Sequence, residues 1–361
     1  MNEFNKKHLI LKEARYVGID LAKNVFGAVV TDRNKTVLKK KMVKRHDFIR
    51  FIEAELPKDI TIFVEGCGTS QFWGRELSVR GFDIKIVPAQ HAKPFVQMGK
   101  KNDLNDAFAI IEAGLRDGIK FIPVKSELQR ELSALVARRS QLMDEKIRLQ
   151  NQIHALFREN GIPLRERQTT VGFAKEANSI LENLKVSYRV KLILSEMLEE
   201  LMIINNKIQS ASVVIENHIE ELKNEESETG KNVKNMLSVY GVGPITVATL
   251  VGSIGDMKQF KTGRQLSAFL GLTPRQFSSG GKSKLGSITK QGNAHLRSLL
   301  ILCSHSFLIR IEKLDPNSHL VIWLKLKMKM MGKKKLVVAL ANKLARILWA
   351  VSVKNEPFSF A

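Results

Sequence analysis

The first clear hydrophobic pattern is YVGIDLAKNVFGAVV at residues 16–30, where the polar pair Lys23-Asn24 separates two apolar runs. Two apolar runs joined by a few polar residues predict a β-hairpin. Residues 35–44 alternate enough to predict a third, exposed strand. Two helix–strand units follow, which predicts an α/β layer architecture. Their helices and strands are expected at residues 47–56, 59–65, 70–80 and 82–87.

The middle of the chain has the spacing of long amphipathic helices. One helical pattern runs over residues 126–161 and ends at Gly161-Ile162-Pro163, and a second runs over residues 180–222. Two such helices flanking a break predict an antiparallel or intersubunit coiled coil. We expect a dimerisation arm here, without catalytic residues.

The C-terminal third opens at residues 235–255 with a helix, the turn Gly241-Val242-Gly243-Pro244 and a second helix. This pattern is typical of a helix-hairpin-helix, whose glycines let backbone N–H groups meet a phosphate. An ordinary αα-hairpin that needs glycine for its turn is the alternative. Residues 273–293 are rich in Gly, Ser, Thr and Lys, which predicts a flexible loop, and helices are expected from residue 294 onward.

Composition points to a globular, polyanion-binding protein. The chain has 361 residues, of which 44% are hydrophobic, and this is enough for two or three domains with real cores. Its net charge is +22. Residues 1–125 carry +8, residues 126–230 carry −3, and residues 231–361 carry +17 with four acidic residues. This distribution favours nucleic acid over an anionic membrane surface as the partner.

Location is predicted from what the sequence lacks. No apolar run reaches the length of a membrane span, and the first residues lack a signal peptide. The two cysteines have no metal-type spacing, so we expect a cytoplasmic protein without disulfides.

Four carboxylates are the candidate metal ligands. Asp20 lies within the first predicted strand, Glu65 ends the fourth, and Asp103 and Asp106 lie three apart at the start of a later helix. Taken singly, each has an ordinary explanation as a helix cap or an ion pair. A mixed sheet whose fourth strand lies beside the first would bring all four to one edge. Hard oxygen ligands select Mg²⁺ or Mn²⁺.

Three motifs together resemble the DEDD transposases of bacterial insertion sequences, the insertion-sequence one-hundred-and-ten family, in its KND-x-NDA subgroup. They are GIDLAKN, VEGCGT with KNDLNDA, and GVGPIT…LGLTPRQFSSGGK…ITKQGNAHLRSLL. The resemblance implies an RNase H-like (RuvC-like) domain at 1–125, a coiled-coil linker at 126–230 and a transposase domain at 231–361. It also implies a structured, element-encoded guide RNA, donor and target DNA, and a homo-oligomer, a dimer or a dimer of dimers on DNA.

The resemblance assigns roles to single residues. Asp20, Glu65, Asp103 and Asp106 would hold Mg²⁺, and Ser279 would attack phosphorus to give a phosphoserine–DNA intermediate, with adjacent Ser278 as the alternative nucleophile. The nucleic-acid contacts are predicted at Gly241, Gly243, Arg275, Lys282, Lys284, Lys290 and Arg297.

The sequence therefore predicts a metal-dependent, RNA-guided DNA recombinase. One rival is a RuvC-like nuclease or junction resolvase that uses water as its nucleophile. Another is a non-catalytic nucleic-acid-binding scaffold, in which the four acids are caps and ion pairs.

Overall fold

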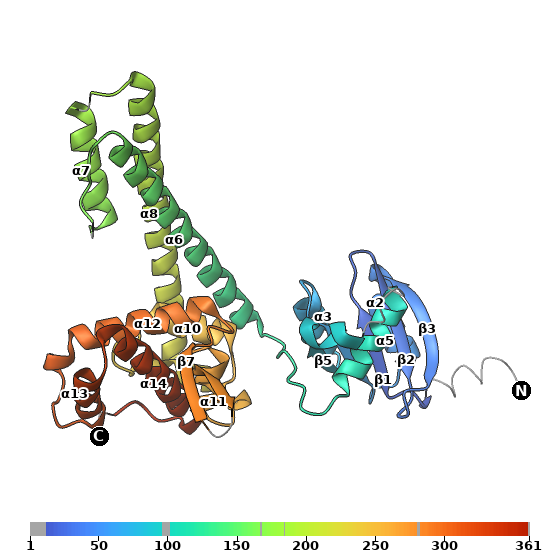
Figure 1. The fold of residues 1–361 in the computed structure, drawn as a ribbon. Coiled ribbons are helices and arrows are strands. Elements are labelled where there is room, and N and C mark those ends of the chain that lie inside the picture. Colours follow the sequence, from blue (N-terminus) through green and yellow to red (C-terminus); the bar gives the residue numbers. More distant parts are fainter. Residues whose placement is uncertain (1–11, 96–101, 167, 184, 280–281, 360–361) are drawn as a thin grey trace, which may run out of the picture. The chain divides into compact units, whose positions relative to one another are not determined.

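A computed structural model describes residues 12–95, 102–166, 168–183, 185–279 and 282–359. The chain divides into two compact units, Met1–Ser126 and Glu127–Ala361. Figure 1 labels the elements of each unit.

The first unit is built on a five-stranded mixed sheet with the order β3-β2-β1-β4-β5. The pairs β1–β2 and β2–β3 are antiparallel, whereas β1–β4 and β4–β5 are parallel. The predicted hairpin, the third strand and the position of the fourth strand beside the first are thus confirmed. The strands are β1 (Tyr16–Asp20), β2 (Val25–Thr31), β3 (Val37–Lys44), β4 (Thr61–Glu65) and β5 (Asp83–Val87).

Helices cover both faces of this sheet. On one face, Phe48 of α2 (Phe48–Glu55) and Trp73 of α3 (Ser70–Val79) pack edge to face with ring centroids 4.9 Å apart, and both rings contact Phe26 of β2. On the other face, α5 (Asp103–Gly114) buries Ala107, Ile110 and Ile111 against Val29 and Phe63. Short helical turns lie at η1 (Arg45–Asp47), α4 (Ala89–Ala92) and η2 (Lys93–Phe95).

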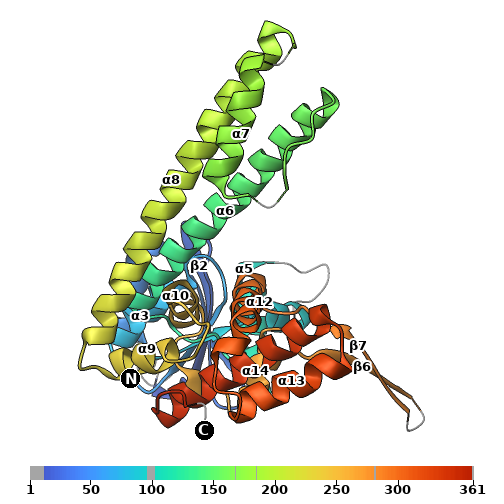
Figure 2. The ribbon, with the colours of Figure 1, turned by 90° about the vertical axis from the view of Figure 1, so that its left-hand side faces the viewer.

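A long helical hairpin begins the second unit (Figure 2). It consists of α6 (Glu127–Glu159), α7 (Thr170–Asn183) and α8 (Tyr188–Asn224). The pattern over residues 180–222 is thus two helices, and the second begins after Ser187, whose hydroxyl accepts from the Val190 N–H. At the tip Phe157 packs with Leu194 and Leu198, so α6 and α8 run antiparallel within one chain.

The base of this helical hairpin belongs to the core of the C-terminal helices. Leu132 of α6 and Ile219 of α8 pack in one cluster with Leu250, Leu300 and Leu344. Residues 126–230 and 231–361 therefore share one compact unit. The remaining helices are α9 (Glu228–Leu237), α10 (Pro244–Ser253), η3 (Met257–Gln259), α11 (Gly263–Phe269), α12 (Ala294–Ile309), η4 (Ile311–Lys313), α13 (His319–Met330) and α14 (Lys333–Lys354).

The predicted flexible loop at 273–293 is wrong, because residues 274–279 and 282–288 are two strands of a β-ribbon. β6 (Pro274–Ser279) pairs antiparallel with β7 (Lys282–Ile288), and Figure 2 shows the ribbon standing out from the neighbouring helices. Its composition is poor in β-branched residues, so pairing and the anchored base, rather than propensity, define the strands.

Among the described helices, α14 is the one long and apolar enough to cross a membrane by length and composition. Its buried residues Leu336, Leu340, Leu344 and Leu348 recur every four positions and lie in the core of the second unit. A core helix passes the same test, so α14 is weak evidence for a membrane span.

Candidate active site and nucleic-acid surface

Two neighbouring parallel strands end on the first two candidate ligands. The register pairs Ile19 of β1 with Val64 of β4, so the next residues, Asp20 and Glu65, end adjacent strands at the same edge. Alternation along β1 puts Asp20 on the face of Gly18, which is the face that α5 covers. The carboxylates thus start from the same end of β1 and β4.

Glu65 also lies on the α5 face. Phe63, two residues earlier in β4, faces α5, because a Cβ on Gly114 would lie 2.3 Å from the Phe63 ring. Strand alternation then places Glu65 on the face of Phe63. Asp20 and Glu65 therefore share both an edge and a face of the sheet.

Two glycines let the start of α5 approach this edge. A Cβ on Gly18 would lie 2.0 Å from the Ala107 carbonyl oxygen, and one on Gly27 would lie 2.6 Å from the Asp103 carbonyl oxygen. Gly27 is the cross-strand partner of Asp20. The backbone of Asp103 is thus seated directly over the β2 neighbour of Asp20, so α5 brings its first turn to the level where β1 ends.

The cap of this helix is Asn102, so the alternative in which Asp103 serves as the cap is wrong. The Asn102 side chain caps α5 by accepting from the Leu104 and Asn105 N–H groups at 3.1 and 2.8 Å. Asp103 is exposed and Asp106 half-buried in the first turn, where the helix dipole favours anions. The Oδ1 atom of Asp106 is buried and has no hydrogen-bond partner among the residues that the structure describes. Capping therefore does not account for either aspartate.

The four carboxylates lie at one edge of the sheet on the face covered by α5. Their donor chemistry fits a hard divalent cation, since all four offer oxygen, and the orphaned Asp106 oxygen lacks the partner that a buried polar atom needs. In the described part of the chain, no three Asp, Glu, His or Cys side chains form a group close enough to hold one ion. The fold brings the backbone positions of the four candidate residues to one edge, and binding an ion would require their side chains to converge.

The β6–β7 ribbon carries the second set of candidate residues. Its register pairs Ser279 with Lys282 and Ser278 with Ser283 at the turn end. The side chains of Ser278, Ser279 and Lys282 lie outside the described structure. Lys284 and Lys290 are exposed, as expected for contacts with a polyanion.

The base of the ribbon is fixed by backbone contacts. Gly271 and Gly292 have positive φ, and a Cβ on Gly292 would lie 2.0 Å from the Phe269 carbonyl oxygen. The Arg297 guanidinium donates to the carbonyls of Leu270 and Gln291 at 3.1 and 2.9 Å. Arg297, predicted to contact nucleic acid, thus binds the ends of the ribbon together.

Arg275 is likewise partly engaged within the ribbon. Its Nη2 donates to the Thr289 carbonyl at 3.3 Å across the two strands. The side chain remains exposed and keeps further donors for a phosphate.

The turn before α10 packs against the backbone of α12, unlike an open phosphate-binding turn. Gly241 has φ +82°, which favours glycine, and a Cβ there would lie 3.1 Å from the Cys303 carbonyl oxygen. Gly243 caps α10 without a side-chain hydrogen bond. Burial raises the pKa of the Cys303 thiol, while hydrogen bonds from Thr246 and the Gly243 backbone oppose the rise. The buried thiol of α12 thus lies at the N-terminus of α10.

A polar contact between α6 and α12 could not be predicted from the sequence. His295 Nδ1 lies 3.1 Å from Ser140 Oγ, and Arg139 Nε donates to Ser212 Oγ at 2.8 Å. Burial lowers the pKa of His295, the Arg139 charge lowers it further, and Asp144 opposes both. Burial against the helical hairpin and the Arg139 charge therefore favour the neutral form of His295 and lower its pKa.

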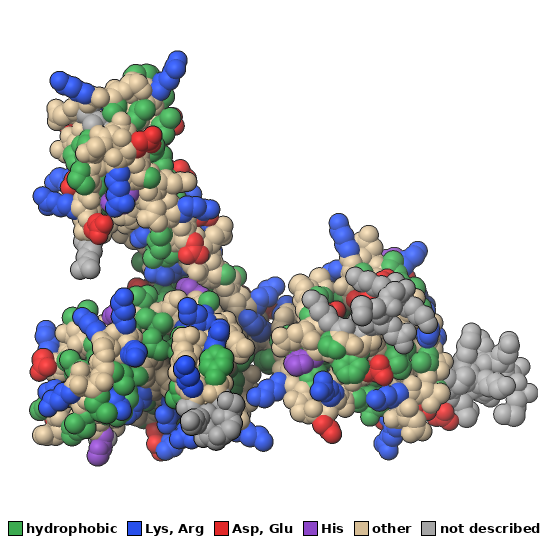
Figure 3. Space-filling view, viewed as in Figure 1, with side chains coloured by type: hydrophobic (Ala, Val, Ile, Leu, Met, Phe, Trp, Pro, Cys, Tyr) green, Lys and Arg blue, Asp and Glu red, His purple; other side chains and the backbone are tan. Residues whose placement is uncertain are grey.

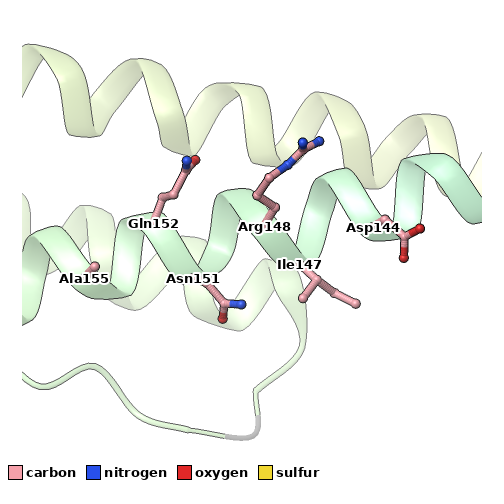
Figure 4. Close-up of a pocket in the computed structure, with 6 residues that line it drawn as sticks. All are labelled: Asp144, Ile147, Arg148, Asn151, Gln152 and Ala155. Carbon is pink, nitrogen blue, oxygen red and sulfur yellow. The ribbon is translucent and has the colours of Figure 1, made fainter.

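The surface of the C-terminal helices is rich in basic side chains, as the charge distribution along the sequence predicts. Lys and Arg side chains are spread over the face of the C-terminal helices in Figure 3. Open hollows lie along α6 and α8 of the helical hairpin. The hollow in Figure 4 follows one side of α6 and is lined by Asp144, Ile147, Arg148, Asn151, Gln152 and Ala155.

Two family models match this chain. A transposase model of the DEDD type of the IS110 family matches residues 17–160. A model described as "Transposase IS116/IS110/IS902 family" matches residues 233–318. The first match spans the four carboxylates, and the second spans the ribbon and the turn before α10.

Curated relatives match over nearly the full length. A Pseudomonas aeruginosa protein named "Probable family 20 transposase" is 34% identical over 346 residues, 93% of this chain and 96% of the relative. The transposase for insertion sequence element IS1111A of Coxiella burnetii is 34% identical over 358 residues, 98% and 94%. The transposase for IS1328 of Yersinia enterocolitica is 30% identical over 343 residues, 95% and 98%. The chain therefore belongs to the IS110 family of DEDD transposases.

Proposed function

We propose that this transposase cuts and rejoins donor and target DNA through a phosphoserine intermediate, with its first unit acting as an RNase H-like metal-binding domain. The observation that carries the proposal is the placement of Asp20, Glu65, Asp103 and Asp106 at one edge and one face of the sheet. The strand order β3-β2-β1-β4-β5, with β2 antiparallel to its neighbours, supports the domain assignment.

Asp20, Glu65, Asp103 and Asp106 would hold Mg²⁺ or Mn²⁺. A divalent ion in such a site supplies charge stabilisation for the attacking and leaving oxygens of a phosphodiester. The protein would hold these four carboxylates in position. Gly18 and Gly27 seat α5 on the sheet, and Asn102 caps the helix and leaves both aspartates free of that task.

Ser279 is the proposed nucleophile on DNA. Its Oγ–P bond forms as the P–O bond to one deoxyribose breaks, and the released strand leaves as a hydroxyl that takes up a proton. The serine proton passes to solvent or to a carboxylate acting as base. A hydroxyl of the partner strand then attacks phosphorus, which restores the serine and joins the new strands. Each step exchanges one phosphodiester for another.

The basic residues would position nucleic acid for this chemistry. Exposed Arg275, Lys284 and Lys290 carry charge along the ribbon, Lys282 lies at its turn, and Gly241 and Gly243 form the turn of the proposed helix-hairpin-helix. An element-encoded, structured RNA that pairs with donor and target DNA is the proposed guide. We place the protein on DNA in the bacterial cytoplasm.

A homo-oligomer, a dimer or a dimer of dimers on DNA, is proposed to form through a coiled coil built on α6 and α8. Ile203 and Val213 of α8 are 53% and 52% exposed on the helical hairpin. Grooves along α6 and α8 accompany them, lined at one place by Leu135, Val214 and His218. Exposed apolar residues in a repeating helical pattern are typical of helix–helix partners.

A strand-exchange assay tests this function. Purified full-length protein is incubated with donor DNA, target DNA, the non-coding RNA transcribed from the element and Mg²⁺. We expect recombinant junctions that require the RNA and disappear when the divalent ion is chelated. Junctions formed equally well without RNA would refute the guide, and free cut ends without junctions would support the nuclease alternative.

A further inference from the structure

An aromatic ring is exposed on the β6–β7 ribbon close to the proposed nucleophile. Phe277 is 61% exposed, and its cross-strand partner is Lys284. On β7, Leu285 is 63% exposed opposite Gln276, which is on the other face of the ribbon from Phe277. Both faces of a narrow ribbon thus carry one large apolar side chain, and the aromatic one lies on the face of Arg275.

A glycine makes room for this ring. A Cβ on Gly286 would lie 3.1 Å from Cε2 of Phe277. The ring therefore lies along the ribbon over Gly286, with more than half of its surface open to solvent. An exposed phenylalanine held beside backbone presents a flat, apolar face that nothing in the described ribbon covers.

The positive charge around this ring favours a polyanion as the ligand. Residues 257–311 contain nine Lys and Arg residues and no Asp or Glu. Arg275 and Lys284, on the same face of the ribbon, are both exposed. An aromatic face bordered by cations is the arrangement that binds nucleobases, because every base offers a π-face and a phosphate beside it. A two-stranded ribbon is also narrow enough to enter the major groove.

We propose that Phe277 stacks on a DNA base next to the phosphate that Ser279 attacks. Residues 277 and 279 lie two apart in β6, so they are positions on the same face of the strand, about 7 Å apart along it. Residue 278 is a position on the opposite face. This proposal rests on Ser279 as the nucleophile for its location, but the stacking itself is measured without chemistry.

The test measures binding and base stacking in full-length protein carrying Ser279→Ala, so that the DNA stays uncut. The probe is a duplex of the element end and its flank, with single 2-aminopurines at successive positions around the junction. We expect a fluorescence change at one position next to the junction. Phe277→Ala should abolish that change and weaken binding about 5- to 100-fold. Phe277→Trp should retain both, since a larger ring still stacks.

Leu285→Ala is the matched control, because the side chain is equally exposed on the opposite face. It should bind within about twofold of the parent and keep the fluorescence change. Phe277→Leu separates stacking from apolar area: a variant that behaves like the parent would overturn stacking. Equal losses in Leu285→Ala and Phe277→Ala would also overturn it, as would a Phe277→Ala chain that binds DNA normally but changes its oligomeric state.

Failure of this proposal is distinguishable from failure of the proposed function. If Ser279 is not the nucleophile, the wild-type protein will form no covalent adduct or Ser279→Ala will still form one, whatever the fluorescence shows. If Phe277 does not stack, the fluorescence change will survive Phe277→Ala while adduct formation still depends on Ser279.

Discussion

Adding a single methyl group at Gly27 should disable the carboxylate site without removing a carboxylate. A Cβ at this position would lie 2.6 Å from the Asp103 carbonyl oxygen and 2.9 Å from the Asp103 Cβ. An ordinary contact begins near 3.4 Å, so the start of α5 must move away by about 1 Å. Overpacking of this kind costs about 1–3 kcal/mol of unfolding free energy. A 1 Å misplacement of reacting groups costs about 100-fold in rate.

The assay compares Gly27→Ala with wild type in strand exchange and in urea unfolding of the full chain. Gly68→Ala is the control in the same unit, because no atom of the described residues lies within 4 Å of its added Cβ and its φ is not positive. We expect Gly27→Ala to lose activity by about 100-fold while remaining folded, and Gly68→Ala to match wild type. A folded Gly27→Ala protein with wild-type activity would refute the claim that the seating of α5 positions Asp103.

Three further predictions concern the ligands, the histidine and the helical hairpin. Asp20→Asn and Asp106→Asn should each abolish recombination with RNA binding retained in a filter-binding assay; normal recombination in Mg²⁺ would remove the metal assignment. The pKa of His295 is lowered in the folded chain from 6.5, so the unfolded chain binds the proton more tightly. The free energy of unfolding should therefore fall as the pH drops below about 6.5, and the fall should stop once the pH is below the folded-state pKa. His295→Gln should remove that part of the pH dependence in urea titrations, and an unchanged profile would contradict it. Ile203→Glu, on the exposed face of α8, should shift the sedimenting species toward monomer, whereas Val171→Glu on α7 should not; equal shifts would refute an interface at Ile203.

The α/β unit could be predicted because its strands are short apolar runs between polar breaks. Alternating apolar residues, and the fully apolar run of the covered strand β4, determine where the strands lie. The position of β4 beside β1 determines which carboxylates share an edge of the sheet. The approach of α5 could not be predicted, because Gly18 and Gly27 read in sequence as strand glycines. Their contacts with Ala107 and Asp103 come from residues about 80 positions away. The choice of Asn102 over Asp103 as cap is similar, since both side chains cap helices well.

The ribbon and the helical hairpin show where local pattern fails. Residues 273–293 have a loop composition, but the Arg297 clamp on Leu270 and Gln291 holds two segments together as strands. The helical hairpin was predicted as two long helices with antiparallel pairing as one alternative, but the burial of its base in the C-terminal core was not predicted. Leu132 and Ile219 fit the amphipathic pattern equally well for a free arm and for a base buried in the C-terminal core.

Detection of a covalent protein–DNA intermediate is the most direct test of the phosphoserine reaction. Labelled donor and target DNA are incubated with protein, guide RNA and Mg²⁺, then denatured and separated by gel electrophoresis. We expect label to migrate with wild-type and Ser278→Ala protein and no label to migrate with Ser279→Ala protein. Label that persists in Ser279→Ala but vanishes in Ser278→Ala would move the nucleophile one residue back. Cut DNA without any protein-bound label would contradict the phosphoserine intermediate and leave a metal-dependent nuclease.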